Sequence, residues 1–167
     1  MRHNQRAKHR VYVGLGSNIN PADNLVRAVV LLRQFTTIEA ISMVWETLPS
    51  YGPGPHFYNT ALCLQVTLTA SLLKSLILRR VEVQLGRLRT INKDAPRTID
   101  VDILVFDGQV LDPKVWEYAF AAVPLAELLP DLKHPNTQQS LREIANKLLS
   151  SGNISPRPEV FRRLNNT

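Results

Sequence analysis

Apolar residues recur along the chain in blocks that predict strands and helices in turn. The apolar run 11–18 ends in glycines, which predicts a buried strand that leads into a tight turn. Asn20 and Pro21 then predict a helix start, because Asn20 can accept from the first free amides and Pro21 suits the first helical position. Further elements are predicted as strands over 37–45, 57–67 and 98–106, a helix over 70–85 with Gly86 as its C-cap, and an irregular loop over 47–56.

The predicted elements follow the order strand, helix, strand, strand, helix, strand. We therefore expect an α/β (α+β) sandwich with a ferredoxin-like βαββαβ core, an antiparallel or mixed sheet, both core helices on one sheet face, and C-terminal helices. Beyond the core, the pattern predicts a short strand at 110–111, a helical turn over 125–129 and an amphipathic helix over 140–149. A single domain over 11–150 is expected, between a basic flexible tail over 1–10 and a loosely attached tail over 151–167.

The composition is that of one globular domain. Of the 167 residues, 44% are hydrophobic and 20% are charged, and this balance excludes a disordered or fibrous protein. The chain has no apolar stretch of the roughly 20 residues that a membrane helix needs. Cys63 is the single cysteine, so an intrachain disulfide is impossible and a cytoplasmic location is favoured.

The net charge of +6 does not by itself indicate a nucleic-acid partner. Four basic residues without an acidic neighbour stand in the first ten positions and account for most of the excess, as a solvated arm would. Aromatic residues are not interleaved with these charges, as they are in proteins that bind single strands. A second basic cluster leads directly into a pair of acidic residues and comprises Arg79, Arg80, Arg87, Arg89, Lys93 and Arg97.

The acidic pair is Asp100 and Asp102, in the strand predicted over 98–106. Because side chains alternate along a strand, both carboxylates point to the same side, about 6.5–7 Å apart. A divalent metal between them removes their repulsion, and magnesium is typically held by one or two carboxylates plus substrate phosphates. Arginine binds phosphate oxygens bidentately, so this region predicts a magnesium–polyphosphate site, the alternative being a pair that is solvated or bound by arginines. The opposite strand face is expected to pack on the helices and carries Ile99, Val101, Ile103 and Val105.

Other candidate motifs are less specific. Gly14 and Gly16 resemble a phosphate loop superficially, but they lack the third glycine of a dinucleotide fingerprint and the Gly-Lys-Ser/Thr of a P-loop, which favours a tight turn. Phe57 and Asn59 share a strand face, which suits a ring beside an amide that reads a ligand, or an ordinary core phenylalanine. The four histidines have no zinc-ligand spacing, and Cys63 is expected to be a buried, inert thiol.

Six motifs surround and include these candidates. They are Gly14-Leu15-Gly16-Ser17-Asn18, Glu46-Thr47-Leu48-Pro49, Phe57-Tyr58-Asn59, Glu82-x-x-Leu85-Gly86-Arg87-x-Arg89, Ala95-Pro96-Arg97-Thr98-Ile99-Asp100-Val101-Asp102 and Phe120-x-x-Val123-Pro124-Leu125, with Leu129-Pro130-Asp131-x-x-His134-Pro135 beyond them. In this order they resemble the 6-hydroxymethyl-7,8-dihydropterin pyrophosphokinase family of the folate pathway. The resemblance covers about residues 11–149, and its block around Asp100 is highly specific.

The resemblance implies transfer of a diphosphoryl group from ATP to the primary hydroxyl of a reduced pterin, with release of AMP. It implies that Asp100 and Asp102 hold two Mg²⁺ ions along the triphosphate. Arg87 and Arg97 would contact the phosphates as catalytic cations. The residues that would complete the ATP side are Glu82 and Arg89.

For the pterin, the resemblance implies a sandwich between Phe57 and Phe120. Asn59 and the backbone of Thr47 and Leu48 would read the heteroatom edge of the ring. The expected partners are therefore ATP and a reduced pterin, without nucleic acid or membrane, and we expect a cytoplasmic monomer.

The chain departs from the family between Asp107 and Ala119. The family has a Pro-His-Pro-like loop followed by an arginine there, whereas this interval has neither histidine nor arginine and is several residues shorter. Lys114 and Lys93 are the cations that could compensate. Three interpretations stay open: a working pyrophosphokinase with a trimmed loop, a diverged enzyme with another acceptor or weak turnover, and a non-catalytic pterin- or nucleotide-binding module.

Overall fold

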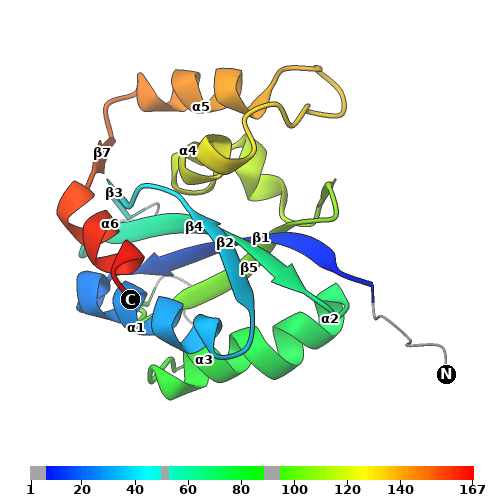
Figure 1. Cartoon of the computed structure of the whole chain (residues 1–167). Coiled ribbons are helices and arrows are strands. Elements are labelled where there is room, and N and C mark those ends of the chain that lie inside the picture. Colours follow the sequence, from blue (N-terminus) through cyan, green and yellow to red (C-terminus); the bar gives the residue numbers. More distant parts are fainter. Residues whose placement is uncertain (1–6, 50–52, 89–94) are drawn as a thin grey trace, which may run out of the picture.

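The computed structural model describes residues 7–49, 53–88 and 95–167. Its centre is one seven-stranded sheet (Figure 1). The strands are β1 (His9–Ser17), β2 (Thr37–Ile41), β3 (Trp45–Thr47), β4 (Phe57–Val66), β5 (Asp100–Phe106), β6 (Gln109–Val110) and β7 (Ile154–Pro156). Their order is β6-β5-β1-β4-β3-β7, with β2 also paired to β4, and the strand pairs in the described residues are antiparallel.

Helices cover both faces of this sheet (Figure 1). One face carries α1 (Pro21–Arg33), α6 (Pro158–Asn165) and a continuous helical segment made of α2 (Ala70–Leu72), the π-helical η1 (Leu73–Leu78) and α3 (Arg79–Gln84). The other face carries the 3-10 turn η2 (Pro113–Trp116), α4 (Ala119–Leu128) and α5 (Leu141–Leu149). The predicted ferredoxin-like βαββαβ core is confirmed, with its two core helices on the same face.

Strand β1 separates two apolar cores because its side chains alternate. Val11, Val13 and Leu15 point to the α1 face and are at most 2% exposed. Tyr12 points to the α4 face, and Gly14 and Gly16 follow it on that side. Since the two glycines carry no side chain, β1 itself contributes none to the space beside Leu104 and Asn59, and this space is part of the candidate site.

A bulge in β5 changes the predicted alternation. Tyr12 pairs with Val105 and Val13 pairs with Ile103, so Leu104 is one extra residue in β5. As a consequence Leu104 and Val105 both belong to the core on the α4 face. The prediction that Val105 packs on the opposite face with Ile103 was therefore wrong.

The start of α1 also differs from the prediction. Asn20 adopts the left-handed conformation with φ 42°, and its side chain makes no capping hydrogen bond. Asn24 instead donates its side-chain N–H to the carbonyl of Ile19 at 2.6 Å. Pro21 does occupy the start of the helix, as expected.

Two further elements differ from the expected bounds. The strand predicted over 37–45 is split into β2 and β3, and Ser42 between them hydrogen-bonds β4 through its backbone and its hydroxyl. The helical turn predicted over 125–129 is the end of the longer α4, which contains Pro124. A proline disfavours a helix interior because it lacks an N–H, and burial of α4 against the sheet outweighs that local preference.

The segment after Ser150 is not loosely attached, contrary to the prediction. Strand β7 pairs with β3, and α6 packs against α1. Val160 and Leu164 are 3% and 0% exposed within the α1-side core. Among the described residues, no helix combines the length and apolar character needed to cross a membrane.

Candidate active site

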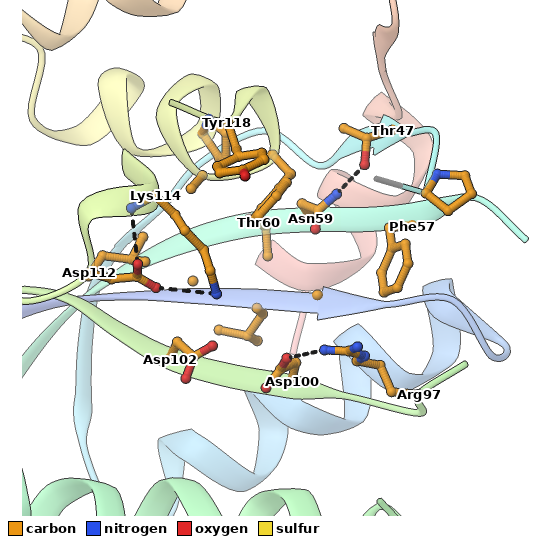
Figure 2. Close-up of a pocket in the computed structure, with 18 of the residues that line it drawn as sticks. Thr47, Phe57, Asn59, Thr60, Arg97, Asp100, Asp102, Asp112, Lys114 and Tyr118 are labelled. Carbon is orange, nitrogen blue, oxygen red and sulfur yellow. Dashed lines mark hydrogen bonds and ion pairs between the residues drawn. The ribbon is translucent and has the colours of Figure 1, made fainter. Parts of the chain in front are cut away.

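A cavity of about 660 Å³ lies between the sheet and the η2–α4 segment (Figure 2). Gly14 and Gly16 form its floor in β1, so their motif is neither the phosphate loop nor the tight turn that the sequence suggested. The floor is narrow, since a Cβ built on Gly16 would lie 3.1 Å from Oδ1 of Asn59. The predicted residues that line the cavity are Thr47, Leu48, Phe57, Asn59, Arg87, Arg97, Asp100, Asp102 and Phe120.

Asp100 lies on the β5 wall between two arginines. An Arg97 Nη1 donates to its Oδ2 at 2.7 Å, and an Arg87 Nη1 donates to its Oδ1. Burial alone would raise the pKa of Asp100, but the hydrogen bonds and charges of the two arginines outweigh it and lower that pKa. Without a ligand, the arginines therefore neutralise the carboxylate, as in the alternative considered for the sequence.

Glu82 binds Arg87 from outside the cavity. Gly86 has φ +75° and ends α3 in a Schellman turn, in which the Arg87 N–H donates to the Glu82 carbonyl at 3.0 Å. The Glu82 carboxylate then accepts from Arg87 Nη1 and from the Val101 N–H, each at 3.0 Å. Burial alone would lower the pKa of Arg87, and the contacts with Asp100 and the charge of Glu82 raise it instead.

Glu82 itself does not line the cavity and is 4% exposed. Its carboxylate connects the end of α3 to β5, so that Arg87 points at Asp100. The structure therefore brings Glu82 to the site as a support for Arg87 and leaves it out of contact with the cavity.

Asp102 lies on the same wall as Asp100, as strand alternation predicted (Figure 2). Its Oδ1 is 3.4 Å from Nζ of Lys74, which comes from the π-helical segment η1 on the other side of β5. The described residues contain no group of three or more His, Cys, Asp and Glu that could cage a metal. Two carboxylates on one wall fit Mg²⁺, which proteins typically hold by one or two carboxylates together with water and substrate phosphates.

The other end of the cavity is aromatic and amide-bearing. Phe57 and Asn59 project from β4, and Phe120 projects from the start of α4. Asn59 is 5% exposed and donates its side-chain N–H to Oγ1 of Thr47 at 2.9 Å, which fixes the orientation of the amide (Figure 2). An Arg97 guanidinium lies 5.8 Å from the centre of the Phe57 ring, so the two ends of the cavity adjoin.

Sequence reasoning missed Tyr118. Its ring centre is 5.4 Å from that of Phe120, and both residues line the cavity. No local spacing signalled it, because residues two apart do not share a helix face, and Tyr118 lies beside Phe120 only because it is the extended N-cap residue of α4. Lys114 also lines the cavity, whereas Arg89 and Lys93 lie outside the described residues.

Comparisons with known proteins identify the family of the chain. Residues 12–130 match the family described as 7,8-dihydro-6-hydroxymethylpterin-pyrophosphokinase, HPPK. The 2-amino-4-hydroxy-6-hydroxymethyldihydropteridine pyrophosphokinase of Pseudomonas aeruginosa is 37% identical over 141 residues, which cover 76% of this chain and 85% of that protein. A folic acid synthesis protein of Dictyostelium discoideum is 28% identical over 170 residues, which cover 93% of this chain and 25% of that protein. The chain thus spans about a quarter of that relative.

The fold is also that of solved structures. The Plasmodium falciparum HPPK-DHPS wild type with pteroate superposes with a TM-score of 0.71 at 12% identity, over 88% of this chain and 45% of that one. At this identity the likeness concerns the fold alone. The family match over residues 12–130, together with the identity to the Pseudomonas protein along most of both chains, shows that this chain belongs to the HPPK family of pyrophosphokinases.

Proposed function

We propose that this chain transfers the diphosphoryl group of ATP to the hydroxymethyl group of 6-hydroxymethyl-7,8-dihydropterin and releases AMP, as a step of folate biosynthesis. The observation that carries this proposal is the shared cavity, in which a carboxylate–arginine wall meets an aromatic and amide-bearing wall. A phosphate donor and a flat heterocyclic acceptor can bind these two walls side by side. Such a transfer needs mainly alignment of the hydroxyl with phosphorus and neutralisation of charge.

On the phosphate side, Asp100 and Asp102 are proposed to hold two Mg²⁺ ions, which would neutralise the triphosphate and the charge that develops on it. Arg87 and Arg97 would then turn from Asp100 to the phosphate oxygens, because a guanidinium forms bidentate hydrogen bonds with phosphate and with carboxylate alike. This exchange needs only side-chain movement, since both arginines already lie at the cavity wall. Glu82 would act by positioning Arg87, and Arg89 completes the proposed ATP-binding set.

On the acceptor side, Phe57 and Phe120 are proposed to stack on the two faces of the pterin. Asn59 would read the heteroatom edge of the ring together with the backbone of Thr47 and Leu48. The bond from Asn59 to Thr47 supports this role, because it leaves the amide with one fixed orientation for the ligand. Ring stacking restricts the acceptor to a plane and directs its hydroxymethyl group toward the phosphates.

We propose that the chain acts as a monomer in the cytoplasm on these two small molecules. The single cysteine, which is buried and unpaired, is compatible with a reducing compartment.

The proposal is tested by product analysis with the pure protein, ATP, Mg²⁺ and the hydroxymethyl dihydropterin. We expect AMP and the pterin diphosphate in equal amounts, and ADP as the nucleotide product would exclude diphosphoryl transfer. The variant Asp102→Asn should lower turnover by at least about 10²-fold, because it removes one carboxylate from the proposed metal site. The control Asp131→Asn, whose side chain is 88% exposed outside the cavity, should keep the wild-type rate. An unchanged rate in the Asp102 variant would remove the metal role from the pair.

A further inference from the structure

The segment between β5 and α4 presents one cation to the cavity. We propose that Lys114 binds the polyphosphate of the nucleotide from the wall opposite Arg87 and Arg97, an inference that rests on the proposed function. Lys114 belongs to the 3-10 turn η2, which forms part of the cavity wall that faces the sheet. It lines the same cavity as Asp100 and Asp102 (Figure 2).

The turn that carries Lys114 is locally well defined. Asp112 caps the 3-10 turn η2 by accepting the Lys114 N–H at 3.0 Å, and Pro113 occupies its first position. Val115, the next residue, is fully buried in the core beneath α4. The cap and the buried Val115 fix the backbone on both sides of Lys114. Its side chain points into the cavity from this fixed position (Figure 2).

The ion pairs of the cavity differ in how strongly they hold their cations. Arg97 lies 2.7 Å from Asp100, and Arg87 is bound to both Asp100 and Glu82. Lys114 Nζ lies 3.9 Å from Oδ2 of Asp112, and its side chain is 51% exposed. The Asp112 side chain is only 18% exposed, but the half-exposed ammonium stands at a separation too long for a direct hydrogen bond, so Lys114 can leave Asp112 for a phosphate at small cost.

The chemistry of a lysine suits this position. Its ammonium is a compact charge on a flexible stem, and it binds phosphate as a point charge without requiring the planar geometry of a guanidinium. The β5 wall supplies arginines and carboxylates, and Lys114 approaches from the η2 side of the cavity. A polyphosphate between the two walls would therefore meet positive charge on both sides, which one wall alone cannot provide.

The inference is tested with three variants of the full chain. Lys114→Met removes the charge and keeps the length, Lys114→Arg keeps the charge, and Lys147→Met is the control on an exposed position of α5 outside the cavity. Steady-state rates give KM for ATP and for the pterin. Calorimetry gives the Kd of the Mg²⁺ complex of α,β-methylene-ATP, a probe that does not require turnover.

We expect Lys114→Met to raise KM for ATP and the Kd of the analogue by about 10-fold or more, because one hydrogen bond between charged groups is lost. KM for the pterin should stay within about 2-fold, since the lost group binds phosphate. Lys114→Arg should recover most of the affinity. Added salt should reduce the difference between wild type and Lys114→Met, because the lost interaction is one between charges.

The other outcomes separate the role of Lys114 from the proposed function. If the wild type is active and Lys114→Met has the same KM for ATP and the same Kd for the analogue as Lys147→Met, the role of Lys114 is overturned and the proposed function stays intact. Equal increases in KM for ATP and pterin also overturn it, because they indicate a general disturbance of the cavity. A wild type that binds the analogue but transfers nothing refutes the proposed function, and the Kd values then still decide on Lys114. A wild type that does not bind the analogue overturns both.

Discussion

Asn59 and Asp100 lie on either side of Gly16, in register across three adjacent strands. Gly16 pairs with Asn59 of β4 on one side and with Asp100 of β5 on the other. Residues paired in this way point to the same face of the sheet, with neighbouring strands about 4.8 Å apart. The backbone positions that carry the proposed pterin-reading amide and the proposed metal-binding carboxylate are therefore about 10 Å apart, and Gly16 of β1 places no side chain between them.

Gly16→Ala tests this arrangement. A Cβ at residue 16 would lie 3.1 Å from Oδ1 of Asn59, so the amide must move by a few tenths of an ångström. We expect KM for the pterin to rise by about 10-fold. Folding should be nearly unaffected, because alanine has less conformational freedom to lose than glycine.

The matched control is Gly54→Ala, where the new Cβ would meet the Pro49 ring at an ordinary 3.8 Å. It should leave KM for the pterin within about 2-fold of the wild-type value. Steady-state kinetics and a urea titration measure the two properties separately. A normal pterin KM in Gly16→Ala would show that the floor of the cavity is not in contact with the acceptor.

Much of the candidate site follows from local sequence periodicity. Alternation along a strand places Asp100 beside Asp102 and Phe57 beside Asn59, and the structure places each pair on one face. The extra residue Leu104 could not be foreseen in this way. A bulge is a property of the pairing between β5 and β1, and nothing in the residues of β5 alone specifies it.

Long-range pairing also explains the other differences. Arg87 and Arg97 surround Asp100 because the end of α3 and the start of β5 meet in space, which charge clustering predicted only as a tendency. The C-terminal segment has few apolar residues, so its pattern predicted a tail. It packs because Val160 and Leu164 complete a core formed by distant residues.

Glu82→Gln should destabilise the fold and weaken ATP binding together. The Glu82 carboxylate accepts from Arg87 and from the buried Val101 N–H, and an amide can replace only part of these bonds. We expect a loss of about 1–3 kcal/mol in the free energy of unfolding, and a higher KM for ATP because Arg87 loses its support. Urea titration and steady-state kinetics measure the two effects, with the exposed Glu117→Gln as control. A loss of stability without any change in KM for ATP would mean that Arg87 does not contact the nucleotide.

The ion pairs between Asp100 and the two arginines predict that the free energy of unfolding falls at acid pH. The arginines lower the pKa of Asp100 in the folded chain below the ordinary 3.8. A carboxyl group with a lowered pKa stabilises the fold fully above its unfolded-state pKa and loses that contribution as pH falls toward the folded-state pKa. At neutral pH, Asp100→Asn should therefore cost about 2 kcal/mol in the free energy of unfolding.

This difference should shrink below about pH 4 and vanish at lower pH, where Asp100 is protonated in both states. Urea titrations of wild type and Asp100→Asn from neutral pH down to the acid transition measure it. Asp131→Asn, at a position whose side chain is 88% exposed, is the control and should change stability by less than about 0.5 kcal/mol throughout. A stability difference that is the same at every pH would contradict the contribution of the Asp100 charge.

Leu164→Ala tests whether the C-terminal helix belongs to the folded domain. Leu164 is 0% exposed in the core that α6 shares with α1, and β7 is held by its pairing with β3. Replacement of a buried leucine by alanine leaves a cavity, and we expect a loss of about 3 kcal/mol in the free energy of unfolding. Asn165→Ala, at the neighbouring exposed position, should change stability by less than about 0.5 kcal/mol. If both variants unfold at the wild-type urea concentration, α6 contributes nothing to the core and the domain ends near Ser150. If only Leu164→Ala is destabilised, the segment is part of the fold, and its contact with β3 also supports the strand that carries Thr47 into the cavity.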